Sequence, residues 1–133
     1  AQILNLMTEL QSELGLTYLF ISHNLAVVSH VADRVGVMYL GRLVGLAEAE
    51  ALFARPKHPY TRMVLDAVPD LEMRGRARTR VGGEVPNPLS PPKGCAFHPR
   101  CPHANARCRE ERPELKLHDG RHAACHAVEE KRL

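Results

Sequence analysis

Tryptophan is absent from this chain of 133 residues, and only three tyrosines and three phenylalanines are present. Phe97 is the single Phe, Tyr or Trp after Tyr60, so the second half has too few flat side chains to stack on nucleic-acid bases. No apolar run approaches the roughly 20 residues that cross a bilayer, so we expect no direct insertion into a membrane. The first residues lack the basic start and cleavage site of a secretory signal, which predicts a cytoplasmic protein with reduced thiols.

Several catalytic motifs are also missing. The sequence has no glycine-rich phosphate loop of the form G-x-x-x-x-G-K-[ST], no strand that ends in an acidic pair suited to magnesium, and no nucleophile beside a base in a known pattern. Phosphoryl transfer needs a phosphate cradle, a metal ion and water activation together. These absences exclude a self-contained site for that chemistry within the sequence.

Cysteine does not occur in the first 94 residues and then occurs four times, at Cys95, Cys101, Cys108 and Cys125. Charge is uneven as well: residues 1–68 carry five basic and six acidic side chains, whereas residues 69–133 carry thirteen and nine. The basic excess can serve as the counter-charge of bound thiolates, and does not require a nucleic-acid partner.

The first half has the pattern of an α/β domain. Residues 1–14 carry apolar side chains at helical spacing, and Gly15 fits the helix stop. Residues 17–21 form a β-rich apolar run without alternation, which predicts a strand buried on both faces of a parallel sheet. Ser22 is placed to cap a second helix over residues 24–32.

Residues 34–40 and 43–46 predict a hairpin that turns at Gly41-Arg42, and residues 48–53 and 60–68 predict two further helices. Pro59 stiffens the start of the last helix, Thr61 or the backbone caps it, and Pro69 ends it. The Arg-, Gly- and Pro-rich residues 69–93 predict an extended linker. Residues 94–133 lack an apolar period and predict a loop-rich extension that needs a metal or crosslink.

The spacing Cys95-x5-Cys101-x6-Cys108-x16-Cys125 predicts a metal centre. Structural zinc sites usually pair their ligands about two to four residues apart, whereas wider spacing suits four loop positions around an iron–sulfur cluster. Zinc, two disulfides, free thiols, and ligation by a histidine are the alternatives. The candidate histidines are His98, His122 and His126, and the arginines placed to hydrogen-bond cluster sulfurs are Arg100, Arg107, Arg109 and Arg112.

Four stretches carry a family resemblance. Thr17-Tyr-Leu-Phe-Ile-Ser-His-Asn-Leu25, followed by Ala32-Asp-Arg-Val-Gly-Val-Met-Tyr-Leu-Gly-Arg42, resembles the last part of an ABC-transporter nucleotide-binding domain. Ala51-Leu-Phe-Ala-Arg-Pro-Lys-His-Pro-Tyr-Thr61 and Gly94-Cys-Ala-Phe-His-Pro-Arg-Cys101 resemble the ATP-binding subunits of the dipeptide/oligopeptide (nickel) importer family. The resemblance implies the C-terminal remnant of a P-loop ABC nucleotide-binding domain over residues 1–68, a linker over 69–93 and a cysteine-rich, cluster-binding extension over 94–133.

The resemblance also implies roles for residues. His23 matches the switch histidine, which approaches the γ-phosphate of ATP and helps position the attacking water. Cys95, Cys101, Cys108 and Cys125 match the ligands of a [4Fe-4S] cluster found in this branch. A complete subunit would use ATP and Mg, and would pair with a second ATP-binding subunit, as a homo- or heterodimer, and with transmembrane permeases at the cytoplasmic face of the inner membrane.

Members of the family hydrolyse ATP to drive uptake of di- and oligopeptides. This chain departs from their pattern because the phosphate loop, the signature and the catalytic glutamate are not among its residues. We therefore expect no ATP hydrolysis by the chain alone. A stand-alone iron–sulfur module, or a zinc-stabilised interaction module, is the alternative function.

Overall fold

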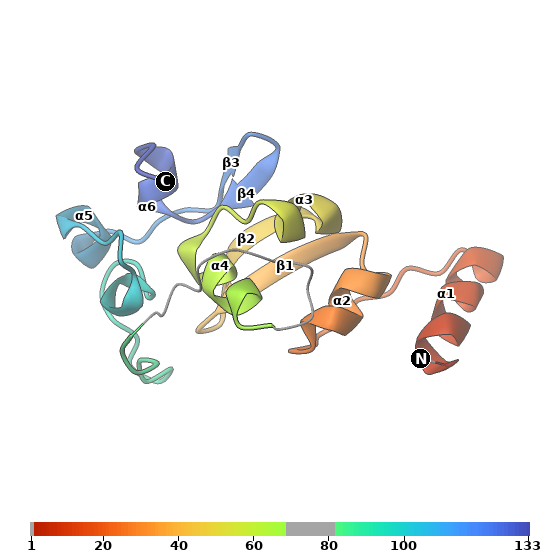
Figure 1. The fold of residues 1–133 in the computed structure, drawn as a ribbon. Helices are drawn as coiled ribbons and strands as arrows, with labels where there is room; N and C mark the ends of the chain where they lie inside the picture. Colours follow the sequence, from red (N-terminus) through yellow and green to blue (C-terminus); the bar gives the residue numbers. More distant parts are fainter. Residues whose placement is uncertain (1, 69–81) are drawn as a thin grey trace.

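A computed structural model describes residues 2–68 and 82–133 (Figure 1). The elements in these residues are, in chain order, α1 (Gln2–Leu14), α2 (Leu25–Val31), β1 (Arg34–Tyr39), β2 (Arg42–Glu48), α3 (Ala49–Ala54), α4 (Pro59–Asp66), the 3-10 helix η1 (His98–Arg100), α5 (Ala106–Glu110), β3 (Lys116–His118), β4 (Arg121–Ala123) and α6 (His126–Glu129). The four helices and the hairpin predicted before residue 69 are confirmed, with ends that differ by about two residues, as helix and strand ends commonly do. Pro69, the expected helix stop, lies outside the described residues.

One antiparallel sheet joins the two halves of the chain, with strand order β1-β2-β4-β3. Leu40 (φ 45°) and Gly41 (φ 77°) adopt the left-handed conformation that a tight turn between β1 and β2 requires. On its other edge, β2 pairs through Gly45 and Leu46 with β4, which belongs to the cysteine-rich segment. The α/β class is confirmed, and its sheet is a small antiparallel one.

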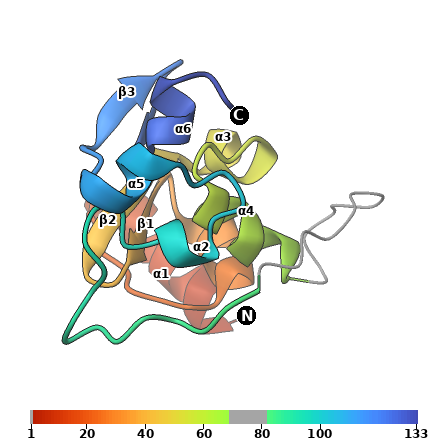
Figure 2. The ribbon, with the colours of Figure 1, turned by 90° about the vertical axis from the view of Figure 1, so that its left-hand side faces the viewer.

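Two small apolar clusters pack against the sheet. The first contains the buried residues Val35, Ala47, Ala49, Leu52 and Leu65, which come from β1, β2, α3 and α4. The second contains Tyr39, Val44 and Phe97. Phe97 belongs to the cysteine-rich segment, which folds back over β2 and α4 (Figure 2). Its ring is 1% exposed and meets Tyr39 and Tyr60 edge-on at 5.3 and 5.5 Å between centroids, a favoured aromatic geometry.

The cap of α2 is Asn24, so the prediction of Ser22 is wrong. The side-chain oxygen of Asn24 accepts the N–H groups of Ala26 (3.1 Å) and Val27 (3.3 Å). An N-cap side chain must belong to the residue directly before the first helical one, and α2 begins at Leu25. Ser22 instead accepts the N–H of Asn24 at 3.0 Å, which orders the turn in front of the cap.

The cap of α4 is His58, and Thr61 is not the cap. Nδ1 of His58 accepts the N–H of Tyr60 at 3.1 Å, as an asparagine oxygen does at other helix starts. Pro59 occupies the first turn as predicted, whereas Thr61 lies inside the helix, where it is 4% exposed.

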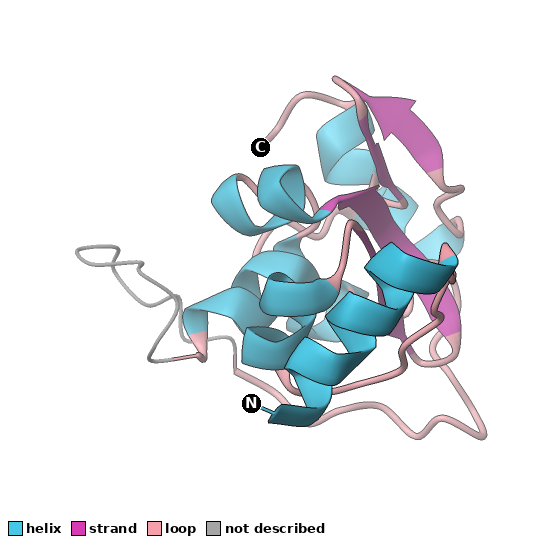
Figure 3. Ribbon diagram, turned by 90° about the vertical axis from the view of Figure 1, so that its right-hand side faces the viewer, coloured by secondary structure: helices cyan, strands magenta, loops and turns pink. Residues whose placement is uncertain are grey.

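The predicted strand over residues 17–21 is wrong. The structure assigns no strand there, and Leu19 and Ile21 are 93% and 95% exposed. A buried parallel strand needs a hydrogen-bonded neighbour on each side, and the described part of the chain places no strand beside this segment. The preceding helix α1 buries none of its residues and lies on the outside of the molecule, beyond α2 (Figure 3).

Candidate functional site

The backbone brings Cys95 and Cys108 together. The N–H of Cys95 donates to the carbonyl oxygen of Cys108 at 2.9 Å. Gly94 makes this approach feasible, because its φ is +70° and a Cβ there would lie 2.5 Å from that same carbonyl oxygen. Asn105 caps α5 by accepting the N–H of Cys108 at 3.0 Å, which fixes the other side of the contact.

Short helices hold the other two cysteines. Cys101 follows η1, and its N–H donates to the carbonyl oxygen of His98 at 3.2 Å. Cys125 stands directly before α6 and is its N-cap residue.

The four thiols are free; Cys108 and Cys125 are buried, and Cys95 and Cys101 are half-buried. Burial raises the pKa of Cys95 to about 11 and also raises the pKa values of Cys101 and Cys125. The charges of the other three cysteines add to the shift at Cys95, an effect that requires the four side chains to share one region. Since the thiolate is the form that binds metals, these thiols need a nearby cation to ionise.

A metal centre fits the chemistry of these donors. Four thiolates suit a thiophilic ion or an iron–sulfur cluster. In residues 2–68 and 82–133, however, no group of three or more His, Cys, Asp or Glu side chains has the arrangement of a metal site. The assignment of the cysteines as ligands therefore stays a prediction.

Of the three candidate histidines, His98 and His126 are engaged in other contacts, and His122 lies in β4 opposite Leu46. Nδ1 of His126 lies 3.3 Å from Oε2 of Glu129, and its Nε2 lies 3.1 Å from the carbonyl oxygen of Glu111. Nδ1 of His98 lies 2.9 Å from the carbonyl oxygen of Cys95. With both ring nitrogens of His126 engaged, the thiols are the better ligand candidates.

The arginines differ from the predicted set. Arg107 binds the carboxylates of Glu111, Glu129 and Glu130 at 2.8, 3.0 and 3.1 Å. Among the arginines of residues 2–68 and 82–133, the one hydrogen-bonded to a thiol is Arg132, whose Nη2 lies 3.9 Å from Sγ of Cys108. Sequence reasoning missed Arg132 because a Lys-Arg pair near the chain end has the pattern of solvated charge.

His58 connects α4 to the cysteine-rich segment. Its ring is 2% exposed, and a hydrogen bond joins it to the backbone of Ala124, the neighbour of Cys125. Burial lowers the pKa of His58 to about 4, and the bond to Ala124 opposes that shift. Because Nδ1 accepts from the backbone, the ring proton lies on Nε2, and the histidine is neutral near pH 7.

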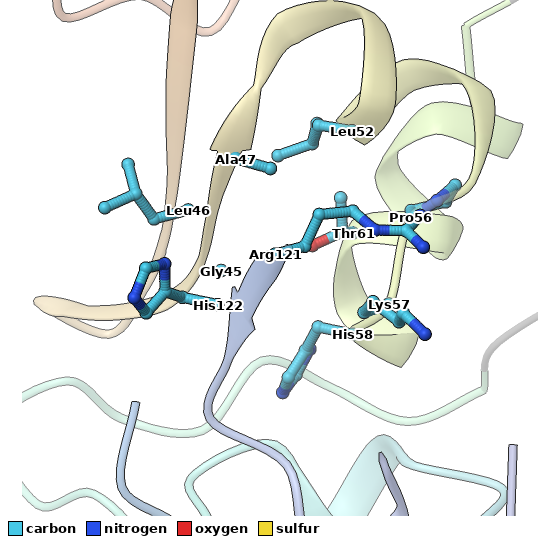
Figure 4. A pocket seen from close by; sticks show the side chains of 10 residues that line it. All are labelled: Gly45, Leu46, Ala47, Leu52, Pro56, Lys57, His58, Thr61, Arg121 and His122. Atoms are coloured by element: carbon cyan, nitrogen blue, oxygen red, sulfur yellow. The ribbon is translucent and has the colours of Figure 1, made fainter. Parts of the chain in front are cut away.

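A small cavity lies beside His58, between β2, β4 and the start of α4 (Figure 4). Its volume is about 10 Å³, which is room for about one water molecule. Such a space is too small for a substrate. We therefore interpret the His58-Pro59-Tyr60-Thr61 run as structural: it begins α4 and connects this helix to the cysteine-rich segment.

The structure does not bring His23 and the cysteines together. His23 is exposed in the loop before α2, whereas α5 and α6, which carry or adjoin Cys108 and Cys125, lie across the sheet from α2 (Figure 1). The two sets of predicted site residues therefore form two separate places on the molecule.

Comparison with known proteins gives consistent matches. A family described as "Oligopeptide/dipeptide transporter, C-terminal region" matches residues 44–108. The di/tripeptide transport ATP-binding protein of Pseudomonas aeruginosa is 54% identical over 131 residues, which cover 98% of this chain and 41% of that protein. The oligopeptide transport ATP-binding protein of Bacillus subtilis is 52% identical over 95% of this chain and 40% of that protein. The dipeptide transport ATP-binding protein of Escherichia coli is 50% identical over 98% of this chain and 39% of that protein.

The matched relatives are the ATP-binding proteins of peptide transport systems. The chain belongs to the dipeptide/oligopeptide ABC importer family and corresponds to the C-terminal part of its ATP-binding subunits. It spans about 40% of the length of the curated relatives it matches. Among the described helices, none is long and apolar enough to cross a bilayer.

Proposed function

We propose that this chain is part of an ATP-binding subunit that energises the uptake of di- or oligopeptides. The observation that carries the proposal is the identity of 50–54% with three peptide transport ATP-binding proteins over nearly the whole chain. The complete subunit would bind ATP and Mg, dimerise with a second ATP-binding subunit and dock on transmembrane permeases. It would lie peripherally at the cytoplasmic face of the membrane.

His23 is the proposed switch histidine of the complete subunit. Its exposed position before α2 leaves the ring free to approach a phosphate supplied by the rest of the subunit. There the imidazole would hydrogen-bond the γ-phosphate and orient the attacking water. Proton transfer and orientation by such a group contribute about 100-fold or more to rate.

ATP turnover by the full-length protein tests this role. We expect His23→Ala to lower turnover at least about 100-fold, while His30→Ala, which removes an exposed histidine from α2, leaves turnover unchanged. The 133-residue chain alone should give no turnover above buffer, because its sequence contains no phosphate loop. Full activity of the His23→Ala protein would refute the role of His23.

Cys95, Cys101, Cys108 and Cys125 are the proposed ligands of a [4Fe-4S] cluster, with zinc as the alternative. Support comes from their free thiols, their burial and their mutual electrostatic effect. When bound, the group crosslinks four loop positions. The chain contributes four sulfurs and the glycine that lets Cys95 approach Cys108.

Analysis of iron, sulfide and zinc in anaerobically purified protein tests this proposal. We expect about four iron and four sulfide per chain, the content of one such cluster, and loss of both in Cys108→Ser. Tightly bound zinc without iron would favour the zinc-stabilised interaction module. A protein that binds neither would refute the metal centre.

A further inference from the structure

The chain turns back on itself after α6. Lys131 has a left-handed backbone (φ 53°), its N–H donates to the carbonyl oxygen of Val128 at 3.2 Å, and the N–H of Arg132 donates to that of Ala127 at 2.8 Å. These two bonds form the Schellman motif that closes a helix. The motif fixes the backbone of Arg132 close to α6, whose first residue follows Cys125.

The side chain of Arg132 is held by three partners. Its Nε donates to Oε2 of Glu130 at 2.7 Å, its Nη1 donates to the carbonyl oxygen of His103, and its Nη2 lies 3.9 Å from Sγ of Cys108. Only 31% of the side chain is exposed. A guanidinium with each nitrogen engaged in a separate contact has a defined orientation.

Glu130, the anchor of Arg132, is itself held in place. Its Oε2 also accepts from Nδ2 of Asn105 at 3.0 Å, and its Oε1 accepts from Nη1 of Arg107 at 3.1 Å. Asn105 caps α5, the helix that carries Cys108. The contacts of Arg132 therefore connect the last residues of the chain to the helix of a predicted ligand.

The contact places the positive charge of Arg132 beside the sulfur of Cys108, and the backbone of Cys108 is in turn hydrogen-bonded to that of Cys95. Thiolates that share a poorly solvated site need such compensation, because their negative charges repel one another.

We propose that Arg132 is a positioning residue of the cysteine site, which orients Cys108 and supplies positive charge to the bound metal centre. This inference rests on the proposed metal site and adds a residue outside the cysteines to it. A fixed cation beside a thiolate-ligated centre stabilises its more negative, reduced state. Removal of that cation should weaken metal retention and make the reduction potential more negative.

The test uses full-length protein purified anaerobically, with metal loss to a chelator and the reduction potential as readouts. We expect Arg132→Gln to lose metal about 10-fold faster or more, since outer contacts of metal ligands contribute about 10–100-fold to affinity, and to shift the potential negatively. Arg132→Lys keeps the charge and should restore most of the potential. Arg42→Gln removes the same charge from an exposed position on β2 and should behave as the wild-type protein does.

The outcomes separate this inference from the metal site itself. Wild-type retention and potential in Arg132→Gln, with metal present in the wild-type protein, would overturn the role of Arg132 alone. A wild-type protein without bound metal would overturn both proposals. Equal loss of metal in Arg132→Lys and Arg132→Gln, with an unchanged potential, would overturn the charge contribution.

Discussion

The exposure of apolar side chains in residues 2–23 and in the cysteine-rich residues 94–133 is the opposite of what the composition of the two segments suggests. The N-terminal segment has the stronger apolar pattern, yet Ile3, Leu19 and Ile21 are 74%, 93% and 95% exposed. The cysteine-rich segment has almost no apolar period, yet Phe97 is 1% exposed. Burial follows the partners that a segment finds, and hydropathy alone does not decide it.

The difference arises from backbone pairing. The cysteine-rich segment reaches the sheet through β4, and the N–H of Ala124 extends this contact by donating to the carbonyl oxygen of Val44 at 2.9 Å. The N-terminal segment has no strand partner in the described residues. Its apolar side chains form an exposed surface, which predicts self-association of the isolated chain.

Replacing Phe97 with alanine is the strongest test of this contrast. Removing a ring that is 1% exposed between Tyr39 and Tyr60 should lower the free energy of unfolding by about 3–5 kcal/mol. Leu19→Ala, at a position that is 93% exposed, should change it by less than about 0.5 kcal/mol. Urea unfolding measures both, and similar losses would contradict the contrast.

Gly94→Ala should have the next largest effect. A left-handed backbone costs an ordinary residue about 1–2 kcal/mol, and the contact of the new Cβ with Cys108, at 2.5 Å, adds about 1–3 kcal/mol of overpacking. Gly120→Ala is the matched control, because Gly120 has a φ of +77° and no neighbouring atom within 4 Å. Chemical unfolding should show a smaller loss for Gly120→Ala, and equal losses would argue against a close approach at Gly94.

Acid should lower the free energy of unfolding through protonation of the buried His58. Because its pKa is lowered to about 4 in the folded protein and is about 6.5 in an unfolded chain, the unfolded state binds more protons between these values. Stability should therefore fall as the pH decreases from about 6.5 to 4, by about 2 kcal/mol at pH 5.

Unfolding free energies at pH 7 and pH 5 measure this effect. The difference should disappear in His58→Gln and persist in His23→Gln, which changes an exposed histidine. A pH slope that survives in His58→Gln would assign the effect to other groups.

The cap of α2 offers the smallest and finest test. Asn24→Ala removes an acceptor of two backbone N–H groups and should cost about 1 kcal/mol, because α2 packs on the first apolar cluster through Leu25 and Val28. Ser22→Ala should cost less than about 0.5 kcal/mol, since Ser22 accepts only an exposed bond from Asn24. A thermal unfolding series ranks the two variants, and the reverse order would restore Ser22 as the cap.

The sequence predicted local structure well and missed the long-range contacts. The β1–β2 hairpin was predictable because β-forming residues flank Gly41, whose φ of 77° suits the turn. The pairing of β4 with β2 was not, because β4 has only three residues, Arg-His-Ala, which carry little strand preference. The strand expected at residues 17–21 is not formed for the opposite reason: its sequence favours a strand, but no strand in the described residues pairs with it.

For the candidate site too, the sequence predicted some residues and missed those that act through long-range contacts. The cysteines are visible as a spacing, and the exposed His23 is visible as part of a family motif. Three other residues act through contacts with residues that are distant in sequence. Gly94 and Arg132 both contact Cys108, and His58 contacts Ala124. Nothing in the spacing of those residues signals such contacts, so only the folded chain identifies them.

The position of β4 on β2 also sets the order in which the protein can assemble on the ribosome. The β1–β2 hairpin closes as soon as its residues emerge, because its contacts are local. The second edge of β2 stays unpaired until β4 is made, more than 70 residues later in the sequence. The cysteine-rich segment therefore gains its contact with β2 only after β4 has been made, and its thiols are accessible to oxygen until then.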